Sequence, residues 1–290
     1  MVDFMQKCTR NKQQKILKNQ GEIILYLLTN KKKFMKTIIS LATRLIPRHH
    51  LQYVSHFFLK IFSLFMRGNK FEDPINGKTY RKLLPYGRLN SRENAIAPDS
   101  MSLERHRLMW LFMKEKTNFF TDNLKFLHIA PEYCFIKIFK GMKNLDYTTG
   151  DLISPWADVK FDVHNIPFDK NSFDVVICNH VLEHVEDSYK VMTEFYRVMK
   201  PGGWGIFQVP IDTNNPNTEE DPRVTDPKER ERLYWQDDHV RLFGLDYGKR
   251  LEKAGFTVTE SDFINELDPK LVERYALPQG EIIYFCEKKI

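Results

Sequence analysis

The chain is short of cysteine and glycine, with 4 and 13 of these among 290 residues. Cys8, Cys134, Cys178 and Cys286 show no paired spacing, and two of them fall in predicted core elements, which favours free thiols in a reducing compartment over disulfides. The apolar stretch 23–28 is only six residues long and no small-residue cleavage site follows it, so no signal peptide is predicted. The sequence contains no internal repeats and no low-complexity tracts.

Two function classes lack the motifs that they need. No G-x-G-x-x-G follows the first predicted strand, and no Tyr-x-x-x-Lys pair lies where a nicotinamide-dependent reductase requires it, which disfavours that class. The basic N-terminal third carries no recognisable nucleic-acid-binding motif, and its aromatic residues form an apolar face. A lipid surface is therefore favoured over nucleic acid as its partner.

Apolar runs and helical periodicities alternate along most of the chain. The run from Phe173 to Cys178 has strand length and ends in Asn179 and His180, where a buried parallel strand would surface. This alternation predicts a mostly parallel sheet covered on both faces, with function at its carboxyl edge. Further strands are predicted at 125–130, 144–149, within 152–162, 204–209, 256–263 and 281–286, and helices at 103–117, 133–140, 186–200 and 245–254.

Four short motifs resemble those of class I S-adenosylmethionine-dependent methyltransferases of the type 11 group. They are I-P-F-D-K-N-S-F-D-V-V (166–176), V-L-E-H (181–184), R-V-M-K-P-G-G (197–203) and A-G-F (254–256). The resemblance covers 161–210 and, more loosely, 124–263. It implies an α/β fold with a Rossmann-like, mostly parallel sheet and helices on both faces. It also implies S-adenosylmethionine as cofactor and methyl transfer as the reaction.

Candidate cofactor-binding residues lie at the ends of the predicted strands. The ribose diol and the cationic methionine tail of the cofactor each need a carboxylate. Asp151 follows Gly150 at the end of the second strand, where related dinucleotide folds place the ribose acid, or it is a turn acid. By resemblance, Asp162 receives the adenine amino group and Val163 offers its backbone amide, although Asp162 alternatively caps the following loop. Asn179 and His180 would lie beneath the methionine or the transferred methyl.

The first loop departs from the family pattern. A glycine-rich turn is expected after the first strand because only glycine lets the backbone approach the ligand closely. This chain instead reads F-L-H-I-A-P-E-Y at 126–133, with His128, Ala130 and Glu132 as the candidate cofactor-binding residues. Alanine keeps some room, and Glu132 near a helix start is a candidate partner for the ligand ammonium. The alternative is a crippled cofactor site.

Three histidines are candidate catalytic bases. Methyl transfer is an in-line displacement that depends on positioning and desolvation, and a base is needed only for weak acceptors such as hydroxyl groups. For these, His180, His184 and His239 are the natural proton acceptors, although His184 alternatively pins a loop by hydrogen bonds. Beside His239, Asp238 and Arg241 are candidate substrate-binding residues, or they pair with each other on the surface.

The loop at 212–231 is polar and charged, contains proline and has no clear periodicity. Such a loop inside a domain is typical of a lid, here over the acceptor, and the alternative is a surface insertion.

The N-terminal third is strongly basic. Residues 1–70 contain 14 Lys or Arg and 2 Asp or Glu, whereas the remaining residues contain 30 and 36. Within 51–67, His56, Lys60, Ser63 and Arg67 define one narrow polar face of a helix, and phenylalanine, isoleucine and leucine cover the rest. This segment is too short and too polar to span a bilayer, but it suits the inner membrane surface, and the alternative is a helix docked on the catalytic core. Met35 is a second candidate start, because 1–34 is unlike folded sequence.

Between this segment and the catalytic domain, D-P-I-N-G (73–77) and A-P-D-S (97–100) resemble the two knuckles of a zinc ribbon that some similar methyltransferases carry. The four thiol positions hold Asp73, Asn76, Ala97 and Ser100. Without thiolates or histidines a closed tetrahedral site cannot form, so no zinc is predicted there. The predicted domains are a basic amphipathic extension at 1–70, this degenerate ribbon-like segment at 71–102 and a methyltransferase domain at 103–290.

The sequence thus predicts an S-adenosylmethionine-dependent methyltransferase in the cytoplasm, peripheral to the inner membrane face. A small-molecule, saccharide or lipid-linked acceptor is expected, with oxygen as the first choice of accepting atom. The alternative is a catalytically inactive methyltransferase-like binding or scaffold protein, suggested by the missing glycines and the lost thiols. The acceptor and the oligomeric state stay open, because specificity resides in loops.

Overall fold

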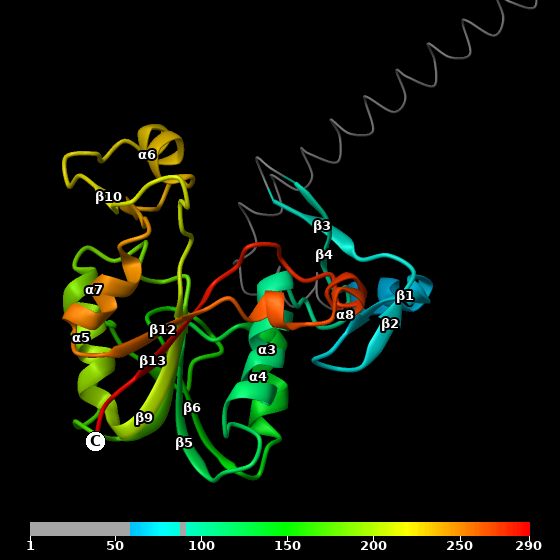
Figure 1. Ribbon diagram of the computed structural model, residues 1–290, viewed down its shortest axis with the longest axis horizontal. Coiled ribbons are helices and arrows are strands. Elements are labelled where there is room, and N and C mark those ends of the chain that lie inside the picture. The colour runs from blue at the N-terminus through cyan, green and yellow to red at the C-terminus, as the bar shows by residue number, and fades with distance from the viewer. Residues whose placement is uncertain (1–58, 88–90) are drawn as a thin grey trace, which may run out of the picture. The chain divides into compact units, whose positions relative to one another are not determined.

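The computed structural model describes residues 59–87 and 91–290, and residues 59–290 form one compact unit. Residues 1–58, including 51–58 of the predicted amphipathic segment, lie outside the described residues. At its centre is a seven-stranded sheet of order β12-β13-β9-β8-β5-β6-β7 (Figure 1). The strands are β5 (Leu124–Ile129), β6 (Leu145–Asp151), β7 (Val159–Lys160), β8 (Phe173–Asn179), β9 (Met199–Gln208), β12 (Thr257–Ser261) and β13 (Ile283–Glu287).

The sheet is mostly parallel, as the alternation of strands and helices predicts. From β7 to β9 each neighbouring pair is parallel, whereas β13 runs antiparallel to β9 and β12 antiparallel to β13. After residue 100 the described helices are α3 (Glu104–Lys116), α4 (Tyr133–Lys140), α5 (Ser188–Val198), α6 (Pro227–Tyr234), α7 (Tyr247–Lys253) and α8 (Pro269–Arg274), with a 3₁₀ turn η1 (Phe263–Glu266). The predicted Rossmann-like α/β fold is confirmed.

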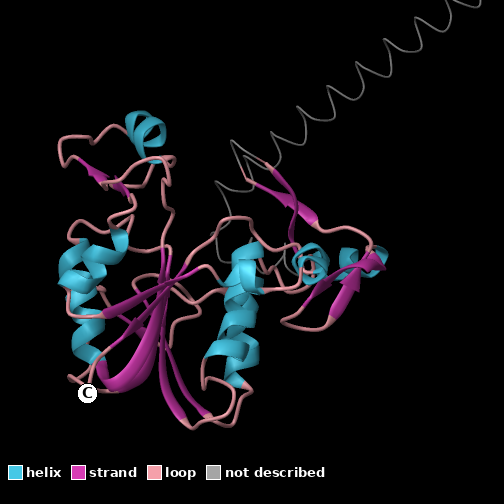
Figure 2. Ribbon diagram, viewed as in Figure 1, coloured by secondary structure: helices cyan, strands magenta, loops and turns pink. Residues whose placement is uncertain are grey.

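Helices cover both faces of the sheet, and each face has its own core. Figure 2 shows the strands between two helical layers, with α5 and α7 on one side and α3 and α4 on the other. Side chains of β5 alternate between the faces, so Leu127 packs under α5 and Phe126 packs under α3 and α4. Asp187 starts α5 by accepting a hydrogen bond from the Lys190 backbone N–H at 2.9 Å.

Two segments differ from the expected secondary structure. The strand expected from Trp204 begins at Met199, because the Pro-Gly-Gly run bulges within β9 instead of separating it from α5. A Cβ added to Gly203 would lie 2.7 Å from the Asp174 carbonyl oxygen, so only glycine fits this close approach. The predicted lid is also ordered: it contains β10 (Glu219–Glu220), paired with β11 (Arg241–Leu242), and the start of α6.

Two hairpins precede the sheet, β1 (Arg67–Asp73) with β2 (Lys78–Tyr80) and β3 (Leu84–Tyr86) with β4 (Arg92–Ile96). The residues at the predicted thiol positions make hydrogen bonds: Ser100 Oγ donates to the Asp73 carboxylate at 2.5 Å, and Asn76 Nδ2 donates to Asp99 at 3.3 Å. Asp73 is fully buried, and burial raises the pKa of its carboxyl group. The zinc-ribbon resemblance of this segment stays a prediction.

Arg107 of α3 joins these hairpins to the C-terminal part of the chain. Its buried guanidinium donates to the carbonyl oxygens of Ala95 and Ser102 at 3.0 and 2.9 Å, and to those of Tyr275 and Ala276 at 2.6 and 2.8 Å. Burial lowers the pKa of Arg107 to about 10, so it keeps its charge at neutral pH. One cation thus satisfies four backbone acceptors from two segments.

Arg107→Met should lower the free energy of unfolding by about 3 kcal/mol or more, because four carbonyl groups lose a charged donor. Urea unfolding at neutral pH measures this. Lys114→Met, an exposed change on the same helix, should stay within roughly 0.5 kcal/mol of the parent chain. A loss for Arg107→Met as small as that of the control would contradict the role of this cation.

Candidate functional site

The candidate site lies at the carboxyl edge of the parallel strands. After β5 the chain builds β6 and β7 on one side and then β8 and β9 on the other, so the order of strands reverses between β5 and β8. Ligands of open α/β sheets bind at such a switch point. The first loop and Asn179 meet here, since Asn179 Nδ2 donates to Glu132 Oε1 at 2.8 Å.

Glu132 is a largely enclosed acid, with a side chain that is 14% exposed. Besides Asn179, its carboxylate contacts His128 Nε2, and His106 Nε2 of α3 lies 4.0 Å away. Burial opposes the charge of Glu132, but the adjacent His128 stabilises it more, and its pKa falls to about 2. The structure places His128 behind Glu132: it is fully buried and its Nδ1 contacts the Tyr147 hydroxyl at 2.9 Å. His128 therefore positions the acid and does not face the crevice.

Ala130 keeps the turn that a glycine would make. Its φ is 49°, in the left-handed region, and its backbone N–H donates to the Gly150 carbonyl oxygen at 2.8 Å. This conformation costs a residue with a Cβ roughly 1 kcal/mol or more, so the surrounding structure has to maintain it. The close backbone turn of the first loop is thus retained without glycine.

Asp151 and Asp162 both make turns, as the alternative interpretation of each expected. Asp151 Oδ1 accepts from the backbone of Ile153 and Ser154 at 2.8 and 2.7 Å, and Asp162 Oδ1 accepts from the backbone of His164 at 2.9 Å. Such turns do not exclude binding, because each uses one oxygen of the carboxylate. No hydrogen bond from the described residues reaches the second oxygen of Asp151 or Asp162. Val163, beside Asp162, is half-buried against the core.

Helix α3 closes the crevice at Glu132. Asn179 Nδ2 also contacts Met109 Sδ at 3.3 Å, and the pocket that remains beside Glu132 measures only about 10 Å³. Its walls include Arg105, His106 and Met109 of α3. Burial lowers the pKa of His106 to about 3, so its ring is neutral and does not compete as a cation for Glu132. A ligand group larger than a water molecule therefore enters only if these side chains move.

All three candidate histidines gather around Glu183. His180, at φ 56°, directs Nδ1 to Glu183 Oε1 at 3.2 Å. The rings of His184 and His239 lie edge to face at 4.7 Å, and ligand atoms of Glu183, His184 and His239 lie within 4.8 Å of one another. Burial lowers the pKa of His239, which keeps its imidazole neutral. The sequence motif V-L-E-H contained Glu183, but nothing in the spacing indicated that it would face all three rings.

The two candidate substrate residues differ in exposure. Asp238 is exposed, and its carboxylate lies 3.6 Å from His184 Nδ1. Arg241 is buried and does not pair with Asp238: it donates to Glu220 at 2.8 Å and to the carbonyl oxygens of Leu182, Val185 and Glu186. Arg241 thus holds the loop that carries Glu183 and His184, and its use by a substrate stays a prediction.

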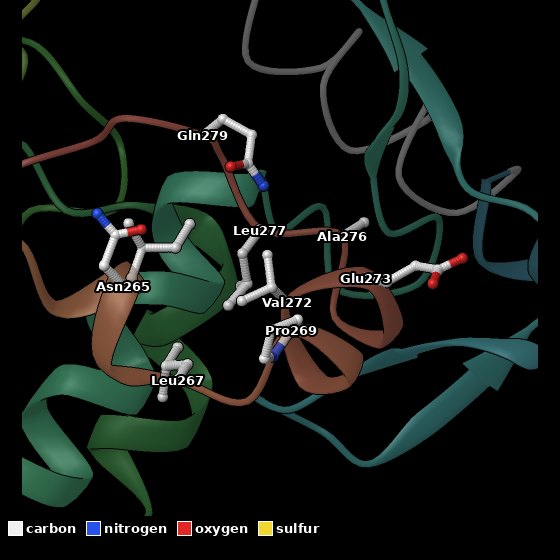
Figure 3. A pocket seen from close by; sticks show the side chains of 9 residues that line it. Asn265, Leu267, Pro269, Val272, Glu273, Ala276, Leu277 and Gln279 are labelled. Atoms are coloured by element: carbon white, nitrogen blue, oxygen red, sulfur yellow. The ribbon is translucent and has the colours of Figure 1, made fainter.

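A second pocket among the described residues is lined by a different set of side chains. It has a volume of about 460 Å³ and lies between η1 and α8. Figure 3 shows Leu267, Pro269, Val272 and Leu277 along its wall. None of the candidate site residues lines it, so the chemistry of the sheet edge does not extend there.

Part of the sheet-forming sequence is similar to known proteins. Residues 140–207 match the family described as a methyltransferase domain. A ubiquinone/menaquinone biosynthesis C-methyltransferase UbiE of Desulfotalea psychrophila is 43% identical over 42 residues, which are 14% of this chain and 17% of that protein. A demethylmenaquinone methyltransferase of Listeria welshimeri is 41% identical over 66 residues, 19% of this chain and 27% of that protein. The chain therefore spans about a sixth to a quarter of these relatives' length.

Among solved structures, the [4+2]-cyclase SpnF is similar with a TM-score of 0.48 and 13% identity, over 82% of this chain and 96% of that one. A 1,6-didemethyltoxoflavin-N1-methyltransferase of Burkholderia thailandensis, with its substrate and S-adenosylhomocysteine bound, has a TM-score of 0.40 and 14% identity, over 58% and 72%.

Glu132→Gln should destabilise the chain at neutral pH and progressively less in acid. The folded pKa of about 2 lies below the ordinary value of 4.5, so the ionised group stabilises the fold above pH 4.5 and this contribution is lost as pH falls through about 2. A loss on the order of 2 to 3 kcal/mol is expected at pH 7. Urea unfolding at several pH values measures it. The exposed Glu186→Gln is the control, and a pH-independent loss would contradict this account.

Proposed function

We propose that the chain is an S-adenosylmethionine-dependent methyltransferase that acts on a hydroxyl group of a small-molecule, saccharide or lipid-linked acceptor. The observation that carries the proposal is the row of polar side chains along the carboxyl edge of adjacent parallel strands, within a chain whose residues 140–207 match a methyltransferase domain. When bound, the cofactor supplies an electrophilic methyl group.

The candidate cofactor-binding residues fit the nucleoside half of the cofactor better than its methionine half. Asp151 at the end of β6 and Asp162 beyond β7 each keep one carboxylate oxygen for the ribose diol and the adenine amino group. Glu132 supplies the negative charge that an ammonium group requires. Because α3 leaves about 10 Å³ beside Glu132, binding of the methionine half needs Arg105, His106 and Met109 to withdraw.

His180 is the best placed of the three candidate bases. Its Nδ1 faces Glu183 Oε1, and its buried Nε2 has no hydrogen-bond partner among the described residues. A carboxylate that accepts from Nδ1–H fixes the tautomer and leaves Nε2 as the proton acceptor. His180 also directly follows Asn179, which lines the pocket beside Glu132. In this role His180 would take the hydroxyl proton, and the acceptor oxygen would bond to the methyl carbon as the bond from that carbon to the cofactor sulfur breaks and S-adenosylhomocysteine leaves.

S-adenosylhomocysteine should bind the full-length chain, and Asp151→Asn should weaken it about tenfold or more, because a charged acceptor for the ribose hydroxyls is lost. Isothermal titration calorimetry measures both affinities. Asp146→Asn, an exposed change on the same strand, is the matched control and should leave the affinity unchanged.

The second candidate is an inactive methyltransferase-like scaffold, and the closed crevice favours it. The partners of Glu132 lie within the chain, and residues of α3 wall the small pocket beside Glu132, to which the enzymatic proposal assigns the ligand's methionine half. Met109→Ala separates the two candidates because it opens this space. If neither the parent chain nor Met109→Ala binds S-adenosylhomocysteine, the enzymatic proposal fails and the scaffold is favoured.

We further propose that the helical segment around residue 60 contacts a membrane surface, which would suit a lipid-linked acceptor. Residues 59–65 are helical, and Ile61, Phe62, Leu64 and Phe65 are 44% to 69% exposed, whereas Ser63 is buried. Exposed aromatic and aliphatic side chains beside basic residues are typical of interfacial helices. In the described part of the chain, no helix is long and apolar enough to cross a bilayer.

The double variant Phe62→Ser/Phe65→Ser should bind vesicles of phosphatidylcholine and phosphatidylserine at least about tenfold more weakly, since each phenylalanine contributes apolar area to insertion. Vesicle co-sedimentation measures this. Leu271→Ser, which removes an exposed leucine of α8, is the control. Equal sedimentation of both variants would exclude the segment as the contact surface.

A further inference from the structure

Glu183, His184 and His239 form a compact group of metal-ligating side chains that the sequence did not reveal. One ligand atom from each lies within 4.8 Å of the others. Glu183 and His239 are each 1% exposed, while the His184 side chain is 33% exposed, so the group is buried on one side and open on the other. Catalytic metal sites combine such a closed interior with one accessible side.

The hydrogen bonds of the two histidines leave one ring nitrogen of each free. His239 Nδ1 contacts the Tyr234 carbonyl oxygen at 2.8 Å, and His184 Nδ1 contacts the Asp238 carbonyl oxygen at 3.3 Å. A carbonyl oxygen only accepts, so Nδ1 carries the proton in both rings and Nε2 presents a lone pair. Metal-binding histidines are typically held in this way, with the second ring nitrogen donating to a carbonyl or carboxylate group.

Two buried atoms of the group lack partners. His239 Nε2 and Glu183 Oε2 have no hydrogen-bond partner in the described part of the chain. Buried polar atoms without partners are rare, because each costs free energy when it leaves water. A cation at the centre of the group would satisfy both atoms at once. Glu183 Oε1 is already paired with His180 Nδ1 at 3.2 Å, so Oε2 is the carboxylate oxygen that remains for a cation.

We propose that Glu183, His184 and His239 bind a divalent first-row transition-metal ion. Two neutral imidazoles and one carboxylate form a set that suits zinc, iron, cobalt or manganese, and they leave coordination positions open. Ligand atoms around such an ion lie about 3 to 4 Å apart, so the group contracts only slightly on binding. His180 and Asp238 lie in the surrounding shell, one against Glu183 and the other against His184.

The position of the ion suggests what it would do, and this part rests on the proposed function. Glu183 and His184 follow Asn179 and His180 at the end of β8, which places the ion beside the candidate base. An acceptor hydroxyl on an open coordination position would have its pKa lowered, which makes it easier for His180 to remove the proton. The ion would thus bind and activate an oxygen acceptor.

The test uses the purified full-length chain, stripped with a chelator and titrated with zinc chloride by isothermal calorimetry. One ion per chain is expected, and His184→Ala, at the partly exposed position, should weaken binding about a hundredfold or more. The exposed Glu186→Gln is the matched control and should bind like the parent chain. Cobalt(II) gives a second readout, since its visible absorption should appear with the parent chain and be lost with His184→Ala.

Absence of a stoichiometric ion in the parent chain would overturn the proposal. Binding that His184→Ala leaves unchanged would overturn it as well, because the ion would then belong to other residues of the chain. Circular dichroism of each variant verifies that it is folded, and Glu183→Gln provides a second ligand change of nearly equal volume. The proposed function is tested separately, by S-adenosylhomocysteine binding, and its failure would leave the zinc titration unaffected.

Discussion

The carboxylate of Glu132 contacts residues of both β5 and β8, the two strands between which the strand order of the sheet reverses. The other candidate residues of the crevice are arranged around this carboxylate. His128 stabilises its charge from β5, and Asn179 donates to it from the end of β8. A charge buried this deeply is costly unless it is paired and hydrogen-bonded. The same contacts therefore hold the first loop in place, fix the end of β8 and position the residues that follow Asn179.

Much of the fold follows directly from local sequence. The apolar run at Phe173 and the helical pattern at Tyr133 place β8 and α4 almost to the residue, because each buries a continuous face. The lid was harder to predict: β10 has two residues and depends on ion pairs from Arg241 and Arg250 to Glu220. Pairings between residues distant in sequence leave no periodicity along the chain.

The candidate site was predictable in its residue types but not in its contacts. Polar residues at strand ends identified Asn179, His180 and Asp151, since the carboxyl edge of a parallel sheet is where they must surface. The sequence did not predict that three histidines would lie close to Glu183. His239 is more than fifty residues from His184 in the chain, and it directly precedes β11, whose position depends on tertiary contacts. The sequence also did not predict that Met109 would close the crevice. Helix α3 precedes the sheet in the chain, and the spacing of its apolar residues shows only that one face is buried, not which residues it contacts.

The position of Arg107 has a mechanical consequence for ligand entry. Met109, which contacts Asn179, and Arg107, which joins the two hairpins to residues 275–276, belong to the same helix. A rigid helix cannot shift at one position without straining the other. Ligand binding in the crevice and docking of the hairpins would then be thermodynamically linked. Ligand binding would weaken docking of the hairpins, and docking would weaken ligand binding by the same factor. A molecule that binds the hairpins would thereby change the ligand affinity of the crevice without contacting it.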